Sequence, residues 1–373
     1  MNIKNEKKTQ FIILAVCFVV FGALLLLANY SYSNENDHMG MYYERGRVVT
    51  VIYESTNPYF LYQMLEVEML SGEFQGLTFE VQNNLMDHTL RAFDEGDRVI
   101  VLLSEYVIQV ISPERSTTLI VFVALFLILL CVIGGKQGTR SVIGLLFSLA
   151  AIIFILVPLT LADYPSILIA IIIGILITIV QITLIAGVNA KSLSAILGCI
   201  AGVLIAALFA FVAGHFAFIS GYHTEHAGHL LAWGPDISLS GIFISGVIIA
   251  AIGAITDTSM TIASAMEEVK LANPTISAAK LAKAGLNVGR DAMGTMSNTL
   301  ILAFVGSSFS LILLITSMNT TWIQFINNNE IGIEVIQGIA GSIGIVLTVP
   351  ITIFIAAKLF SVSMTNKNKI NSE

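Results

Sequence analysis

Charged residues are scarce in this sequence. Asp, Glu, Lys and Arg make up only 12% of its 373 residues, whereas hydrophobic residues make up 56%. Ordinary globular domains carry about 25% charged residues, so this composition excludes a protein that keeps most of its surface in water. It is typical of a chain that lies largely within a lipid bilayer.

Cysteines and several familiar motifs are also lacking. The three cysteines, Cys17, Cys131 and Cys199, all fall in hydrophobic runs, where thiols usually act as inert packing residues, so no disulfide framework is expected. The sequence contains no GxxxxGK[ST] loop, no HExxH and no GxSxG. These absences argue against an ATP-driven pump and a metalloprotease, and solute transport would need an ion gradient or a partner's ATPase.

What the chain does contain is eight hydrophobic runs. Each approaches or exceeds the about 20 residues that a transmembrane helix needs, and the loops between most of them are short. The sequence therefore predicts an all-α polytopic membrane bundle of about eight transmembrane helices. The runs cover approximately residues 10–28, 117–134, 141–162, 166–188, 193–219, 240–265, 296–317 and 335–357.

Small residues and a proline predict details of this bundle. Gly198, Gly202 and Ala206 recur every four residues, as do Gly338 and Ser342, which favours close contact between helices. Pro158 is expected to kink its helix.

The distribution of basic residues predicts the orientation. Lys and Arg occur at the N-terminus, in alternate short loops and in the C-terminal tail, while the other short loops contain none. The positive-inside rule then places both termini in the cytoplasm and the chain in the cell membrane. The first run resembles a signal peptide, but no small-x-small cleavage site follows Ala28, so we expect it to remain as an anchor.

The segment 29–116 is the one polar region of any size, and its expected location is extracytoplasmic. Hydrophobic and polar residues alternate in several stretches that glycines separate, a pattern that predicts β-strands. We expect a small five-stranded β-barrel of the OB or SH3 kind, which either recognises a ligand or serves as a spacer. The predicted divisions are a cytoplasmic tail and anchor at 1–28, this β-rich domain at 29–116, a seven-helix membrane domain at 117–357 and a cytoplasmic tail at 358–373.

An aspartate interrupts the sixth hydrophobic run. Gly253, Asp257, Thr261 and Ala265 recur every four residues, so they share one face of a helix, and a charge at membrane depth costs at least a few kcal/mol. The helical rise of about 1.5 Å per residue predicts that Asp257 lies level with three polar residues of the next run. The group is either an ion- or proton-coupling site or a buried hydrogen-bond network that fixes helix register. Its further members are Ser297, Asn298 and Thr299.

A charged cluster is expected at the cytoplasmic side of the same two runs, formed by Glu267, Glu268, Arg290 and Asp291. Arg290 and Asp291 are adjacent, so on a helix their side chains point about 100° apart and each needs another partner. Glu267 or Glu268 is the expected partner of Arg290. The alternative is a solvated cluster without specific pairs.

Between these charges the sequence predicts a short cytoplasmic interfacial helix at about 275–289. Asn273 and Pro274 match an N-cap followed by proline at the first helical position. Gly285 and Gly289 would then permit turns before the next run.

Three histidines, His223, His226 and His229, lie in the outer loop GYHTEHAGHLLAWGPD. Their spacing of three would let two imidazoles share a zinc or copper ion if the loop were helical. Gly221 and Gly228 argue against a rigid helix, so a solvated, pH-responsive loop is the alternative. No other cofactor is expected.

The run TDTSMTIASAMEEVKLANPTISAAKLAKAGLNVGRDAMGTMSNTLILAF resembles the signature of the YibE/F family of bacterial multi-pass membrane proteins. The resemblance covers residues 250–308 and implies a bacterial cell membrane and a shorter homologous membrane subunit as partner, but no biochemical activity. A weaker likeness to SecD/SecF and RND-type transporters follows the order ITDTSM, MEEV, LAKAGL and DAMGTMSNTLI. That likeness implies a proton-driven mechanism by analogy, although the short outer domain and the NPTIS insertion depart from the pattern.

Two classes of function are compatible with these features. The first is a membrane transporter or export accessory protein coupled to a proton or cation gradient through Asp257. The second is a non-catalytic scaffold or assembly subunit whose β-domain binds a partner or the cell wall, and an enzyme acting within the membrane comes third. We expect contact with the lipid bilayer and none with nucleic acid, and the sequence does not identify a substrate.

Overall fold

The computed structural model describes residues 3–33, 42–57, 60–84, 92–104, 107–219 and 238–370. The chain divides into two compact units. One comprises Met1–Glu35 together with Gly134–Glu373, and the other comprises Asn36–Ile133.

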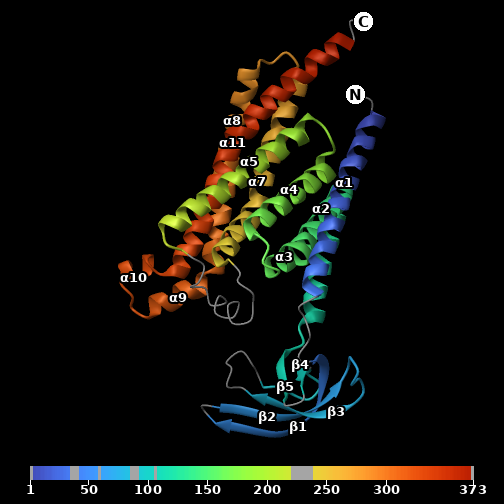
Figure 1. Ribbon diagram of the computed structural model, residues 1–373, viewed down its shortest axis with the longest axis vertical. Coiled ribbons are helices and arrows are strands. Elements are labelled where there is room, and N and C mark those ends of the chain that lie inside the picture. The colour runs from blue at the N-terminus through green and yellow to red at the C-terminus, as the bar shows by residue number, and fades with distance from the viewer. Residues whose placement is uncertain are drawn as a thin grey trace. The chain divides into compact units, whose positions relative to one another are not determined.

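The unit Asn36–Ile133 contains a closed five-stranded barrel (Figure 1). The strands follow one another around the barrel in the order β1-β2-β3-β5-β4, and all pairs are antiparallel except β3 with β5. The predicted five-stranded barrel is confirmed, and its one parallel pair fits the OB type rather than the SH3 type. The strands are β1 (Tyr42–Asn57), β2 (Phe60–Met69), β3 (Thr78–Asn84), β4 (Arg98–Leu103) and β5 (Ile108–Pro113).

Alternation along the strands fills the barrel with apolar side chains. Leu65, Val67 and Met69 of β2 point inward and are fully buried, together with Phe93 from the segment before β4. The register between β1 and β2 shifts between Val48 and Thr50 and again between Val51 and Tyr53. Each shift is a β-bulge that adds one residue to β1 and increases its bend, which helps a sheet of five strands to close.

A buried amide ties the segment before β4 to the barrel. The side-chain oxygen of Gln63 accepts hydrogen bonds from the Phe93 backbone N–H and the Asn83 amide, each at 2.9 Å. Its amide nitrogen donates to the Phe93 carbonyl at 3.2 Å and to Glu54 at 3.1 Å. Because Gln63 is only 1% exposed, these bonds replace those that its amide would make with water.

The barrel leads into α2 (Ser116–Ala151), and Glu114 caps the start of this helix. Its carboxylate accepts hydrogen bonds from the Ser116 hydroxyl and from the Thr117 backbone N–H, the latter at 3.2 Å. These hydrogen bonds, the one from Ser116 above all, lower the pKa of the Glu114 carboxyl because they favour its charged form.

The other unit is a helical bundle (Figure 1). Helices α7 and α11 pack against each other and against both α5 and α8, α4 packs against α5 and α7, and α1 packs against α3 and α4. Its elements, besides the end of α2, are α1 (Ile3–Ser33), a π-helix (Ile152–Leu156), α3 (Val157–Leu161), α4 (Ser166–Ala186), α5 (Ala190–Phe216), α7 (Leu239–Ala272), α8 (Ala278–Ser307), α9 (Phe309–Ser317), α10 (Trp322–Ile326) and α11 (Asn329–Ile370). The π-helix ends two residues before Pro158, as expected where proline removes a hydrogen-bond donor from a helix.

Six of the described helices are long and apolar enough to cross a membrane, and α8 with α9 adds a seventh if this pair, bent by 55°, forms one span. The eight predicted runs and the helices of the structure differ at one place. Ser116–Leu161 is a single stretch of 46 residues, and it includes two predicted runs, 117–134 and 141–162. At about 1.5 Å per residue it would be about 69 Å long, more than twice the about 30 Å hydrocarbon core. Gly135 interrupts it with a non-helical backbone (φ 54°, ψ −132°).

Helices α5 and α11 approach each other closely at small residues. A Cβ on Gly198 would lie 2.9 Å from the Thr352 Cβ, and one on Gly202 would lie 3.1 Å from the Gly344 carbonyl. The Thr348 hydroxyl also donates a hydrogen bond of 3.3 Å to the Gly198 carbonyl. The small residues predicted to favour helix contact in α5 therefore lie against α11.

The predicted interfacial helix at 275–289 is wrong as a separate element. These residues form the first turns of α8, which begins at Ala278 after the N-cap Ser277 and continues unbroken to Ser307, while Asn273 ends α7. Gly285 and Gly289 make no turns; they are buried and let α8 pack against Met266 of α7 and Val349 of α11. Likewise, α11 extends to Ile370 through most of the predicted tail.

Candidate functional site

The long helix α7 places Asp257 near its middle. Ser238 caps the helix by accepting a hydrogen bond of 3.2 Å from the Gly241 backbone N–H. Ile255 and Ile262 are fully buried, whereas Gly253, Asp257 and Thr261 are exposed. The predicted polar stripe thus exists on one face of α7, and that face lies at the surface of the bundle instead of in its core.

The Asp257 carboxylate has no partner within the described part of the chain, where it forms neither a hydrogen bond nor an ion pair. The nearby hydroxyls are already engaged. Thr258 and Ser259 each donate to a carbonyl one turn earlier, at 2.8 Å, and Thr256 lies 3.2 Å from the Cys199 sulfur. The network that would fix helix register through Asp257 is therefore not formed by these three neighbours.

Contacts between α7 and α8 fix their relative register. Gly285 faces Met266 and Gly289 faces Ile262, so four residues forward along α8 correspond to four residues back along α7. Continuing this register puts Asp257 opposite Gly294, and Gly253 opposite Asn298. Asp257 was predicted to lie level with Ser297, Asn298 and Thr299. In the structure it lies about one helical turn, or about 5 to 6 Å, from that level.

The three predicted residues of α8 do not share one side. Asn298 and Thr299 are exposed, and the Thr299 hydroxyl donates to the Thr295 carbonyl at 2.9 Å. Ser297 has a buried hydroxyl without a hydrogen-bond partner. Asp257 and Thr261 of α7 and Asn298 and Thr299 of α8 are therefore all exposed, whereas the Ser297 hydroxyl is buried.

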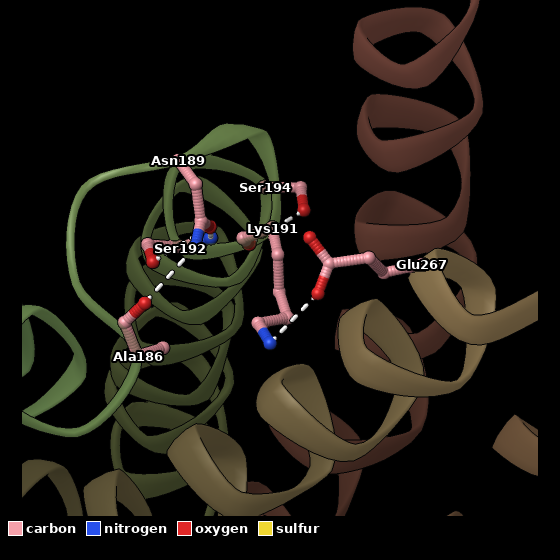
Figure 2. Close-up of polar contacts among 6 residues, drawn as sticks. All are labelled: Ala186, Asn189, Lys191, Ser192, Ser194 and Glu267. Atoms are coloured by element: carbon pink, nitrogen blue, oxygen red, sulfur yellow. Dashed lines mark hydrogen bonds and ion pairs between the residues drawn. The ribbon is translucent and has the colours of Figure 1, made fainter. Parts of the chain in front are cut away.

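The charged cluster has a different pairing from the predicted one. Glu267 of α7 forms an ion pair of 2.8 Å with Lys191 at the start of α5, as Figure 2 shows. In the same view Asn189 caps α5, accepting from the Ser192 backbone N–H at 2.8 Å and donating to the Ala186 carbonyl at 3.0 Å. Glu267 thus pairs with Lys191 and not with Arg290, for which Glu267 or Glu268 was the predicted partner.

The remaining members of that cluster stay at the surface. Glu268, Arg290 and Asp291 are exposed, and in the described residues none of them forms an ion pair. Arg290 and Asp291 point apart on α8, as the sequence predicts for adjacent helical residues.

A second acidic residue in the bundle was missed. Glu334 lies on α11, next to Ser308 at the bend between α8 and α9. One of its carboxylate oxygens and the Ser308 hydroxyl are buried without a hydrogen-bond partner of good geometry. Glu334 immediately precedes the predicted run 335–357 and is not among the predicted site residues. A single acidic residue within the first turns of a long apolar helix was the available signal.

The predicted metal site at His223, His226 and His229 lies outside the described residues. Within the described ranges, no group of three or more His, Cys, Asp or Glu side chains is placed to hold a metal ion. The metal at the histidine loop stays a prediction.

Several apolar helices of membrane length define this chain as a membrane protein. The family model described as "YibE/F-like protein" matches residues 122–362. The match covers more than half of the chain, so the chain belongs to this family and the resemblance found in the sequence is confirmed. Comparisons with curated proteins and with solved structures gave no match.

Proposed function

We propose that this protein is a membrane transporter or export accessory protein that binds a proton or another cation at Asp257. One observation carries the proposal: a carboxylate near the middle of a membrane-length helix, on an exposed polar face, without a partner in the described chain. A carboxylate in that position needs either a proton or a cation to offset the cost of its charge. Asn298 and Thr299, about one helical turn from the level of Asp257 on the adjacent helix, carry amide and hydroxyl oxygens of the kind that bind such a cation.

The proposal includes a topology. Eight spans with both termini in the cytoplasm require two crossings within Ser116–Leu161, and the length of that stretch and the break at Gly135 support this count. The ion pair between Lys191 and Glu267 then lies at the cytoplasmic surface. Asp257 lies ten residues from Glu267, or about 15 Å deeper, close to the middle of a hydrocarbon core of about 30 Å.

Asp257→Asn tests the proposal because it keeps the size and the hydrogen-bonding capacity of the side chain but removes its titratable charge. We expect the variant to insert and to unfold at the same temperature as the parent or higher, yet to fail to restore the phenotype of a deletion strain. Purified parent protein in vesicles loaded with a pH-sensitive dye should conduct or exchange protons, or respond to a sodium gradient, and the variant should not. Asn298→Ala should weaken the same activity.

Asp163→Asn is the matched control, since Asp163 lies between α3 and α4, outside the membrane-length helices, and its loss should change neither complementation nor flux. Full complementation by Asp257→Asn would contradict the coupling site. Loss of Asp257→Asn from the membrane would identify a structural role instead.

A scaffold whose β-domain binds a partner is the second candidate. Tyr42, Tyr43 and Tyr53 of β1 are more than half exposed, and tyrosine is enriched at protein interfaces. Replacing all three with serine should abolish complementation if this reading holds, while Asp257→Asn should then leave complementation intact.

A further inference from the structure

Helix α8 carries a polar face that no described part of the chain covers. Its six residues are all exposed and lie within an arc of about 140° around the helix. This α8 polar face consists of Asn287, Arg290, Asp291, Gly294, Thr295 and Asn298.

The glycines of α8 distinguish its covered side from its uncovered side. Gly285 and Gly289 are buried, and a Cβ on either would collide with α7 or α11. Gly294 differs, because a Cβ there would meet no atom within 4 Å, and the same holds for Gly253 on the exposed side of α7. Small and polar residues of this kind form helix contacts in membranes, and no helix in the described part of the chain covers them.

This face extends into the depth expected for the membrane. The register places Arg290 opposite Thr261, six residues from Glu267, which corresponds to about 9 Å below the Lys191–Glu267 pair. Asn298 lies eight residues further on, about 12 Å deeper. Polar and charged groups at these depths are costly against lipid and are expected to face protein or water.

The α8 polar face carries one positive and one negative charge, so it is complementary to the same face of a second copy. Arg290 and Asp291 have almost the same depth, point in different directions, and have no ion-pair partner in the described chain. A two-fold axis along the membrane normal preserves depth, so it can bring Arg290 of one copy to Asp291 of the other, and the reverse. A partner helix of one charge sign could satisfy only one of these two residues.

We propose that the α8 polar face is an interface between two copies of this chain. The second copy would cover Gly294 and form two reciprocal Arg290–Asp291 pairs. The proposal concerns assembly, and it holds whether or not Asp257 binds a cation.

Cysteine cross-linking in native membranes tests the position of the interface. In a variant with Cys17, Cys131 and Cys199 replaced by alanine, Gly294→Cys should form a disulfide-linked dimer on mild oxidation, because the two-fold axis brings position 294 near its own copy. Leu204→Cys on α5 is the matched control; Leu204 is 43% exposed and should remain monomeric. Equal yields at the two positions, no dimer at Gly294→Cys, or an adduct with a different protein would each overturn the proposal.

A charge reversal tests the reciprocal pairs. Arg290→Asp should place like charges against Asp291 of the second copy and lower the dimer association constant at least about tenfold, as counted by photobleaching steps of labelled protein diluted in vesicles. Adding Asp291→Arg to that variant should restore dimers to near the parental fraction, since both pairs re-form with inverted sign. A parent that is monomeric in dilute vesicles, or a double variant as dissociated as Arg290→Asp, would refute the arrangement. The flux assay with Asp257→Asn is a separate measurement, and its outcome does not change this result.

Discussion

The contact between α5 and α11 is tight enough that one methyl group should weaken the bundle. In Gly198→Ala the new Cβ would lie 2.9 Å from the Thr352 Cβ and 3.2 Å from its Cα. The Cα belongs to the backbone, so a change of rotamer in Thr352 cannot remove the clash. Carbon atoms in contact are separated by at least about 3.5 Å, so α11 must move away by about 0.6 Å.

The change in the free energy of unfolding of Gly198→Ala follows from opposing effects. Overpacking of this kind costs about 1–3 kcal/mol, and the Thr348 hydrogen bond to the Gly198 carbonyl, at 3.3 Å, adds up to about 1 kcal/mol when it is lost. Replacing glycine with alanine inside a helix returns about 1 kcal/mol. We therefore expect Gly198→Ala to lower the free energy of unfolding by about 1–3 kcal/mol, the range given for overpacking alone.

Steric trapping in bicelles would measure this free energy without removing the lipid. Gly253→Ala is the matched control, because a Cβ at Gly253 meets no atom within 4 Å, and this variant should be as stable as the parent or more stable by up to about 1 kcal/mol. If Gly198→Ala were as stable as Gly253→Ala, the close packing of α5 against α11 would be refuted.

Three further predictions concern topology and the barrel. Cysteine labelling of Ser55→Cys and Ser277→Cys should occur from opposite sides of the membrane, and labelling of both from one side would contradict the proposed orientation. Residues 42–113 expressed alone should fold as a β-rich monomer with cooperative melting, as checked by far-UV circular dichroism; a helical spectrum would contradict the barrel. Gln63→Leu should destabilise that domain by about 2–3 kcal/mol because it removes the hydrogen bonds that the buried Gln63 amide makes with the Phe93 backbone and the Asn83 amide, whereas Gln82→Leu on the exposed side of β3 should change the melting temperature little.

The sequence predicted the elements better than their contacts. Alternation and helix length depend on local composition, so the barrel strands and the long apolar helices could be predicted from residue order alone. The role of Gly285 and Gly289 could not, because a helical glycine that permits close packing and a glycine that permits a turn look alike until the neighbouring helix is known. Here Met266 and Val349 pack against Gly285 and Gly289, which shows that both glycines permit close packing and not a turn.

The candidate site shows the same limit. The four-residue spacing of Gly253, Asp257 and Thr261 predicts one polar face, and the structure contains it. Whether that face points into the bundle depends on how α5, α8 and α11 surround α7, which no local pattern encodes. The ion pair of Glu267 with Lys191 joins residues 76 positions apart, and which of several lysines and arginines reaches one carboxylate depends on how the helices pack.

The strand order of the barrel has a consequence for its biosynthesis. β5 pairs with both β3 and β4, so a nascent chain that ends before Ile108 has two strands with unpaired edges. Such edges readily pair with other chains. The domain can close only after residue 113 has become available, and until then its two unpaired edges are exposed to aggregation or to a chaperone.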